Sequence, residues 1–323
     1  MGVLNMMRSM ITTNEWNIGV ADVKLEELVG DDESPASNEV CPSVRWMPKP
    51  WFVRMQADPC LLEHDGRLYV YYERMSIAST KGQLRCGELT KGGGWACPGR
   101  PMIRLGHHAS YPFVFRHLNV FYCVPETGRS NRVVLYESDA PAGPWVKHSV
   151  LLEGVSARDS SLFWFRDRWW LWCTVAGNGP HSSQSDLNIW HAPEPWGPWE
   201  AHRLRPVKTD IHSSRPAGRP YILNDTLYRP AQDCWPRYGA RIVINRVVTV
   251  TPDDFAEEFC CSIEPDPKGP YREGLHTIAT AGGLVMVDGC RSTVTLNPSS
   301  MAKAVLAEAR KKLGGTSRYH PTT

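Results

Sequence analysis

The chain of 323 residues has 42% apolar and 22% charged residues and a formal net charge of +2 at pH 7, the composition of a folded globular protein. Its basic residues form no stripe, so the sequence predicts no nucleic-acid binding. No apolar run approaches the roughly 18 residues of a membrane span, so we expect no transmembrane segment.

The N-terminal segment lacks the pattern of a secretory signal, because it has no long apolar core and no small-residue cleavage site. We expect residues 1–13 to be disordered. The segment Trp16–Val23 has the composition of a strand but no hairpin partner nearby, so its partner must come from elsewhere in the chain.

The stretch Ala57–Glu73 predicts a β-hairpin. Asp58 stands at the head of a short apolar strand, the residues at 64–66 (HDG) make a tight turn, and an aromatic-rich strand from Leu68 to Tyr72 follows. The hairpin ends on Glu73, an acidic residue next to an apolar strand.

The same order of head, strand, turn and second strand recurs four more times. The five heads, about fifty residues apart, are Asp58, Tyr111, Asp159, Arg215 and His276. This period is typical of propellers, in which each repeat is a four-stranded blade. We therefore predict an all-β fold, a five-bladed β-propeller over residues 14–292, with residues 14–30 as the closing strand of the last blade.

Residues 293–323 predict a short C-terminal helix and tail. Within the run 299–313, Met301, Val305 and Leu306 share an apolar helical face, and Gly314 stops the helix.

The ten cysteines form no CxxC pair, which argues against a zinc site of that kind. Cys60, Cys123 and Cys173 lie in predicted apolar strands, where a free thiol packs as a small apolar group. We therefore expect reduced cysteines in a cytoplasmic protein.

The predicted topology gathers polar residues at one mouth of the central channel, because the second strand of each hairpin runs antiparallel to the first. The strand heads contribute Asp58, Tyr111, Asp159, Arg215 and His276. The second-strand ends contribute Glu73, Glu126, Gln232 and Asp233, with Asp288 as a further candidate. The loops 127–132, 177–185 and 234–239 open on the same face and are rich in residues suited to polyol recognition.

Crowded carboxyl groups beside an arginine and a histidine suit cleavage of a glycosidic bond, in which one carboxyl donates a proton and another acts as base or nucleophile. We predict Asp58, Glu126 and Asp159 as catalytic residues. The predicted substrate-binding residues are Glu73, Tyr111, Arg215, Gln232, Asp233 and His276. An Asp at a strand head can instead cap a turn or bind a neighbouring backbone amide, and this structural alternative stays open.

The histidines give little support for a metal site. His107, His108 and His276 share only loop spacing, so we predict no metal-binding residues. No cofactor is expected, and a channel-bound hard cation such as calcium stays open.

Several runs resemble one domain family, in the same order along the chain. WNIG, ADPCLL, SYPFVF with VPE, SRPAGR, PAQDC with RYG, and LHTI with VDG resemble the N-terminal propeller-like domain of plant glucosamine inositolphosphorylceramide transferases, also found in bacterial proteins beside formyltransferase-like domains. The resemblance covers residues 14–292. In the plant proteins glycosyl transfer is assigned to a separate C-terminal domain that nothing here matches, so transferase activity does not carry over.

A more distant resemblance is to five-bladed glycoside hydrolases of the arabinanase, xylosidase and fructosidase type. Those enzymes use an Asp at the head of the first blade, which matches Asp58. The arabinanase type has a further Asp in the second blade, where this chain has Tyr111, and a Glu acid in the third, where it has Asp159. The departures leave either a rearranged set that includes Glu126 or a sugar-binding propeller without catalysis.

The sequence thus predicts a glycoside hydrolase-like enzyme that acts on a carbohydrate or glycoconjugate by carboxylate acid–base catalysis. The alternative is a non-catalytic propeller that binds a glycan or glycolipid headgroup and serves a separate transferase partner. A propeller enzyme that acts on a non-sugar metabolite is a third class.

Overall fold

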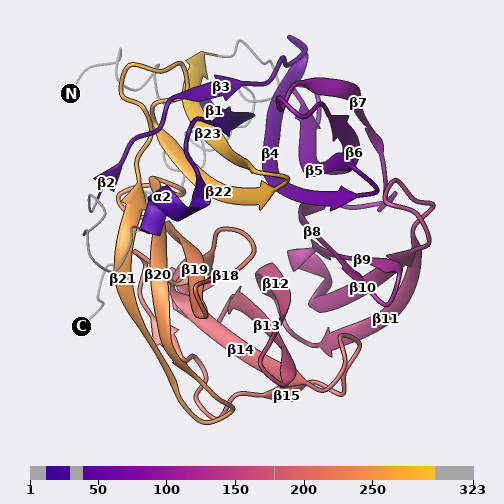
Figure 1. Ribbon diagram of the computed structural model, residues 1–323, viewed down its shortest axis with the longest axis vertical. Coiled ribbons are helices and arrows are strands. Elements are labelled where there is room, and N and C mark those ends of the chain that lie inside the picture. Colours follow the sequence, from indigo (N-terminus) through magenta and orange to yellow (C-terminus); the bar gives the residue numbers. More distant parts are fainter. Residues whose placement is uncertain (1–11, 30–38, 178, 295–323) are drawn as a thin grey trace, which may run out of the picture. The chain divides into compact units, whose positions relative to one another are not determined.

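The computed structural model describes residues 12–29, 39–177 and 179–294. This part is almost entirely β-structure (Figure 1), as predicted, with the short helices α2 (Leu25–Val29) and α3 (Ser182–Ser185) and the 3-10 turn η1 (Gly128–Ser130). None of the described helices is long and apolar enough to cross a membrane. The predicted C-terminal helix at 299–313 lies outside the described residues, as do residues 1–11.

The chain divides into two compact units, residues 16–290 and residues 1–15 with 291–323. In the smaller unit, the described residues show an ion pair between Arg291 and Glu15, with Nη2 and Oε1 2.9 Å apart. All predicted site residues lie in the larger unit, so the account below concerns residues 16–290.

The strands of this unit repeat one pattern, in which an inner strand is followed by strands that pair outward, mostly in antiparallel order. The first group comprises β4 (Val53–His64), β5 (Arg67–Ser76), β6 (Gln83–Leu89) and β7 (Trp95–Pro101). The second comprises β8 (Ser110–His117), β9 (Val120–Glu126), β10 (Arg132–Ser138) and β11 (Val146–Glu153). The third comprises β12 (Ala157–Phe165), β13 (Arg168–Val175), β14 (Asp186–Ala192), β15 (Glu200–Ala201) and β16 (Lys208–Thr209).

The last two groups draw strands from the beginning of the chain. The fourth comprises β17 (Arg215–Pro216), β18 (Tyr221–Leu223), β19 (Thr226–Asp233), β20 (Arg241–Val250), β21 (Phe255–Ile263) and β2 (Glu39–Val40). The fifth comprises β22 (Gly274–Ala281), β23 (Leu284–Val294), β1 (Thr12–Ala21) and β3 (Val44–Trp46). In sheet order β1 lies between β23 and β4, and it meets β4 through the single parallel pair Trp16 and Met55.

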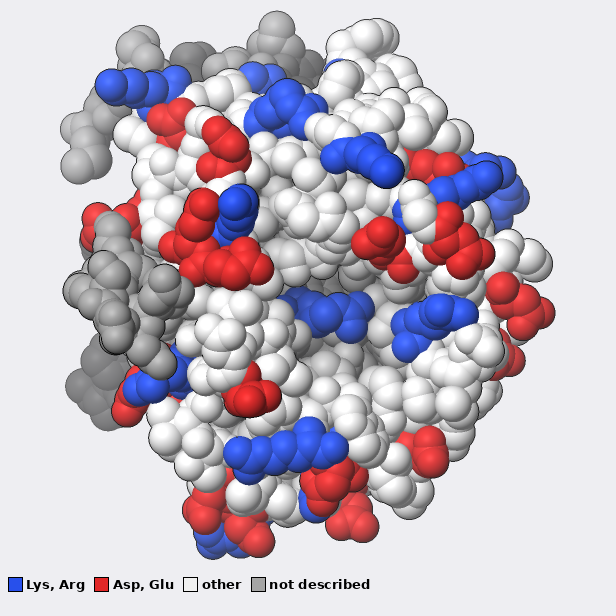
Figure 2. All heavy atoms as spheres, viewed as in Figure 1, with Lys and Arg blue, Asp and Glu red and all other residues white. Residues whose placement is uncertain are grey.

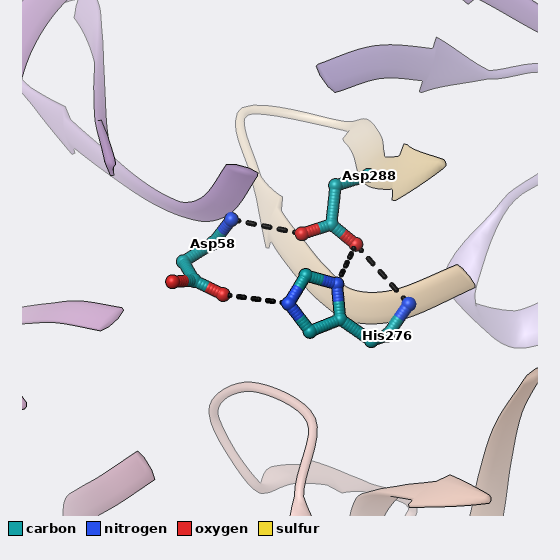
Figure 3. A group of neighbouring side chains, drawn as sticks. All are labelled: Asp58, His276 and Asp288. Atoms are coloured by element: carbon teal, nitrogen blue, oxygen red, sulfur yellow. Dashed lines mark hydrogen bonds and ion pairs between the residues drawn. The ribbon is translucent and has the colours of Figure 1, made fainter. Parts of the chain in front are cut away.

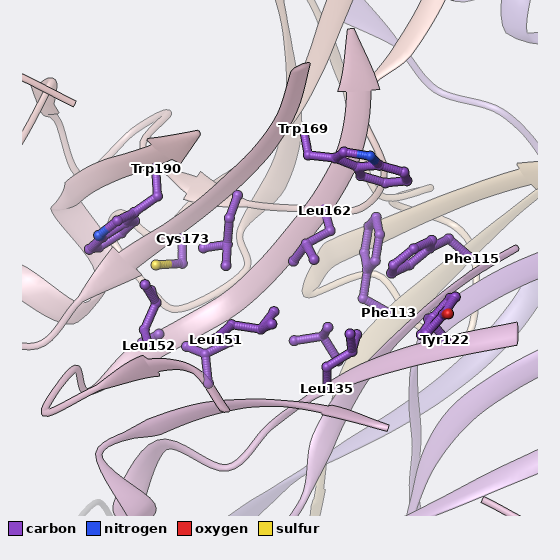
Figure 4. Close-up of a cluster of buried hydrophobic side chains, with 14 of the residues drawn as sticks. Phe113, Phe115, Tyr122, Leu135, Leu151, Leu152, Leu162, Trp169, Cys173 and Trp190 are labelled. Carbon is purple, nitrogen blue, oxygen red and sulfur yellow. The ribbon is translucent and has the colours of Figure 1, made fainter. Parts of the chain in front are cut away.

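Apolar clusters fill the space between successive strand groups. Between the second and third groups, Phe113 and Leu135 pack with Leu162 and Trp169 (Figure 4). A comparable cluster brings Ile18 of β1 together with residues of the first and fifth groups. The aromatic residues of these strands therefore act mainly as core.

Charges of both signs are interspersed over the face seen in Figure 2, and no basic stripe crosses it. A hollow near the middle of this face contains basic side-chain atoms. The face therefore offers no continuous track for a nucleic-acid backbone.

Candidate active site

Three strand heads share an unusual backbone conformation. Asp58, Tyr111 and Asp159 have φ angles of 55°, 43° and 53° although each lies within a strand. At the same points the pairing with the second strand shifts in register, which identifies a β-bulge in each hairpin. A bulge frees its residue from the ladder and re-aims the side chain, so these side chains can reach neighbouring inner strands.

Asp58, His276 and Asp288 form a buried chain of hydrogen bonds (Figure 3). The imidazole of His276 lies between the two carboxylates, with Nε2 3.0 Å from Asp58 Oδ1 and Nδ1 2.8 Å from Asp288 Oδ1. Asp288 also accepts the backbone N–H groups of Asp58, His276 and Thr277 at 2.8, 3.1 and 2.9 Å. Asp288 therefore fixes both the ring and the backbone around it.

Asp58 also binds the next inner strand. Its Oδ2 accepts the backbone N–H of Tyr111 at 3.0 Å, and its Oδ1 accepts the hydroxyl of Thr277 at 3.3 Å. Burial opposes the charge of Asp58, but the hydrogen bonds from His276 and Tyr111 lower its pKa below the ordinary 3.8. Asp58 is therefore ionised at neutral pH, and it makes the backbone-amide contact considered as the structural alternative.

His276 is held as an imidazolium. Burial opposes its charge, but Asp288 and Asp58 raise the pKa of His276 to about 10. The ligand atoms of Asp58, His276 and Asp288 lie within 4.8 Å of one another, a spacing that a metal ion could span. While the ring donates from both nitrogens it has no lone pair for a cation, so a metal ion could bind at this cluster only after His276 loses a proton.

Asp159 is occupied by an ion pair. Arg215 donates from Nε to Asp159 Oδ2 at 2.6 Å and from Nη2 to Oδ1 at 3.3 Å. Gln232 donates to the same Oδ2 at 2.6 Å, and the Tyr238 ring lies 5.0 Å from the guanidinium carbon of Arg215. Asp159 thus holds Arg215 in place through two-point contact.

Glu126 lies beside this ion pair. Its Oε2 is 3.6 Å from Arg215 Nη2 and accepts the Asp159 backbone N–H at 3.3 Å, and its Oε1 is 3.8 Å from Arg158 Nε. Burial raises the pKa of Glu126 well above the ordinary 4.5, and the charge of Asp159 adds to the rise. Glu126 therefore loses its proton at a higher pH than Asp58 does, and 11% of its side chain is exposed.

Glu73 is a second carboxyl group with a raised pKa. It is 3% exposed, and its Oε1 has no hydrogen-bond partner among the described residues. The Nδ1 atom of His108 lies 3.8 Å from this oxygen but already accepts the Gly82 N–H at 2.8 Å. Burial raises the pKa of Glu73 well above 4.5, with contributions from the charges of Asp58 and Glu126.

The predicted residues fall into two linked networks, one around Asp58 and one around Asp159. Tyr111 joins them, because its N–H binds Asp58 and its hydroxyl lies 2.9 Å from Ser161 Oγ next to Asp159. Asp233 makes separate contacts, with its carboxylate 3.0 Å from both His212 Nδ1 and Arg241 Nε. Its role in the structure is to tie the loop after β19.

Sequence reasoning missed three contributors to the site. The Trp16 and Tyr238 rings lie 4.1 Å and 5.2 Å from the His276 ring, and Arg158 approaches Glu126. Tyr238 lies in the loop 234–239, which the sequence places at the site, and Arg158 directly precedes the candidate residue Asp159. Nothing local in the sequence connects Trp16 with His276, because 260 residues separate them.

Solved structures of similar fold are glycoside hydrolases. The chain aligns over 90% of its length with 92% of a family 117 glycoside hydrolase from Zobellia galactanivorans (TM-score 0.54, 12% identity). It aligns over 70% of its length with 78% of an α-L-arabinofuranosidase from Clostridium thermocellum (TM-score 0.52, 18% identity). At these identities the similarity shows the fold alone, so the chain has an all-β fold of the propeller type found in glycoside hydrolases.

The family is shown by sequence. The model of the N-terminal domain of glucosamine inositolphosphorylceramide transferase 1 matches residues 30–272, so this chain belongs to that family, and the resemblance found in the sequence is confirmed. The full-length transferase 1 of Oryza sativa subsp. japonica is 28% identical over 247 residues, covering 73% of this chain and 33% of the relative. That of Arabidopsis thaliana is 26% identical over 268 residues, covering 77% and 35%. The chain spans about a third of the length of these relatives.

Proposed function

We propose that residues 16–290 form a five-bladed propeller with a carbohydrate-directed acid–base site at the strand-head mouth of its channel. The five strand groups would be the blades, and β1 would close the ring beside β23. The fold shared with glycoside hydrolases and the family of a glycolipid glycosyltransferase both support a carbohydrate ligand.

The observation that carries the proposal is the difference in pKa between Asp58 and Glu126, which belong to the two networks that Tyr111 joins. The pKa of Asp58 is lowered and that of Glu126 is raised, which is the division that glycoside cleavage requires. Burial raises the pKa values of Glu73 and Glu126, and neighbouring carboxylates add to the rise.

In the proposed reaction Glu126 gives its proton to the departing glycosidic oxygen as the bond from the anomeric carbon to that oxygen breaks. Asp58 takes a proton from the attacking water, and the water oxygen forms the new bond to the anomeric carbon. Asp159 positions Arg215, whose guanidinium would bind a substrate hydroxyl or an anionic substituent. Tyr111, His276 and Gln232 would hold the strands in register around the sugar, and no channel cation is required.

The alternative is a non-catalytic module that binds a glycan or glycolipid headgroup for a separate transferase. The ion pairs that occupy Asp58 and Asp159 favour it, because they reduce the number of free carboxylate lone pairs in the mouth.

A panel of glycosides separates the two functions. Turnover and calorimetric sugar binding are measured on the wild type and on Asp58→Asn, Glu126→Gln and Asp159→Asn. The hydrolase proposal expects turnover that falls on the order of 10²–10⁴-fold in Asp58→Asn and Glu126→Gln. Binding without turnover in the wild type would support the binding module, and turnover that survives both changes would contradict the site.

A further inference from the structure

A second cavity lies at the opposite end of the inner strands, next to the hairpin turns. Its lining comes from all five strand groups and includes Leu62, Phe115, Trp164, Trp169, Arg219 and Ile222. Arg219 and Leu61 also line the narrower cavity that runs along the inner strands to Asp58. The two cavities therefore meet at Arg219, at the far end of the channel from the acid–base site.

Arg219 brings a positive charge into this mainly apolar hollow. Its guanidinium lies over the Phe113 ring, 4.6 Å from the ring centre, and its Nη2 donates to the Val114 carbonyl. Among the described residues no carboxylate lies within ion-pair distance of Arg219. A guanidinium carries five N–H donors, so most of them point to no described protein acceptor. A half-buried cation without a counter-ion is costly, and an anionic ligand would relieve that cost.

Arg219 is the candidate anion-binding residue of the hollow, because the other charged lining residues are exposed at its rim. Arg116 is exposed at the rim, and its Nη2 already donates to Asn119 Oδ1 at 2.6 Å. Glu63 is also exposed at the rim and carries the one carboxylate among the described lining residues. The hollow thus has a net positive charge, and the Arg219 guanidinium contacts the Phe113 ring and the Val114 carbonyl.

The walls of the hollow suit a ring-shaped ligand. Trp164 leaves 49% of its surface exposed and Ile222 leaves 52%, and both line the cavity. An exposed indole offers a flat apolar face with a polar N–H edge, which matches a sugar ring with its C–H face and hydroxyl rim. Ligand sites combine such apolar walls with a few placed polar groups, as this one does.

We propose that this second mouth binds an acidic sugar, meaning a sugar ring that carries a carboxylate or a phosphate. The oxyanion would take two parallel hydrogen bonds from the Arg219 guanidinium, and the ring would stack on Trp164. The site is separate from the acid–base mouth, so it does not depend on the function proposed for that mouth.

The test is calorimetric titration of the 323-residue chain with glucuronate, glucose 6-phosphate and neutral glucose, with tryptophan fluorescence recorded in parallel. We expect saturable binding of at least one acidic sugar and none of glucose. Binding of glucuronate would identify a carboxylate as the favoured oxyanion, and binding of glucose 6-phosphate would identify a phosphate. Arg219→Gln should weaken this binding at least about tenfold, because it removes a two-point charged contact.

Matched variants keep the result interpretable. Arg116→Gln makes the same chemical change in the same hollow and should alter affinity by less than about twofold, because Arg116 already bonds Asn119. Trp164→Ala changes an exposed side chain and should weaken binding and remove most of the fluorescence change, even if Arg219→Gln fails to fold. Absence of saturable binding below about 10 mM, or equal binding of glucose and the acidic sugars, would overturn the proposal.

Discussion

At the scale of single residues, the carboxylates of the site are charged groups that also hold neighbouring inner strands together. Asp58 accepts a backbone N–H from β8 and side-chain donors from β22, so it joins three inner strands while it stays ionised. Asp159 joins β12 to β17 through its ion pair with Arg215. Substitution of Asp58 or Asp159 is therefore expected to change the stability of the fold as well as turnover.

His276 should stay protonated well above neutral pH. Its folded-state pKa of about 10 exceeds the ordinary 6.5, so its contribution to stability is fully present below pH 6.5 and is lost as the pH rises from 6.5 toward 10. Nitrogen NMR of the histidine rings should show no titration of His276 between pH 5 and about pH 8. A titration midpoint below pH 7 would contradict the buried imidazolium.

Asp58→Asn should lower stability as well as turnover. The amide keeps the shape of the side chain but removes the charge that faces His276, so the pKa of His276 falls and the free energy of unfolding at pH 7 drops by about 1–3 kcal/mol. Asp65→Asn, at a side chain that is 83% exposed, should change it by less than about 0.5 kcal/mol. Chemical denaturation measures both values, and equal stability of Asp58→Asn and wild type would show that the ion pair is not formed.

At the scale of elements, the hairpin turns show where local sequence is sufficient. Asp65-Gly66, Asn224-Asp225 and Gly282-Gly283 have positive φ at both residues, as two-residue hairpin turns of type I′ require. These residue types are those that adopt such angles readily, which is why the hairpins could be predicted from the sequence. Leu118-Asn119 has the same angles, but leucine is poorly suited to its φ of 47°.

Leu118→Asn should therefore stabilise the protein. Leu118 is 75% exposed, so little packing is lost, and asparagine tolerates the left-handed region at lower cost. We expect the free energy of unfolding to rise by about 0.5–1 kcal/mol, measured by denaturant titration. Leu118→Val, which adds a β-branched side chain at the same φ, should lower it, and the reverse order of the two variants would contradict the turn geometry.

The sequence predicted the strands and the gathering of strand heads, but it could not predict how their charges pair. Asp58 and Asp159 stand at heads that a repeated local pattern identifies. Their partners, His276 and Arg215, lie on other repeats, and only the folded arrangement decides which cation meets which carboxylate. The raised pKa of Glu73 could not be predicted either, because it results from burial and from neighbours distant in sequence.

At the scale of the whole molecule, β1 holds the beginning of the unit of residues 16–290 to its end. Ile18 is fully buried in a cluster with Val70 of β5 and Met286 of β23. Ile18→Ala should lower the free energy of unfolding by about 2–5 kcal/mol in a single transition, because the cavity lies between the first and last strand groups. Ile77→Ala, at a side chain that is 37% exposed, is the control and should cost less than about 1 kcal/mol. A small effect of Ile18→Ala would mean that β1 does not close the structure.

The proposed function rests on two carboxyl groups whose pKa values are shifted in opposite directions, Asp58 downward and Glu126 upward. Carbon NMR titration of the side-chain carboxyl groups tests this without a known substrate, with Asp58→Asn and Glu126→Gln used to assign the two signals. The account predicts that Asp58 titrates below 3.8 and Glu126 well above 4.5. Titration of both groups at their ordinary values would contradict it.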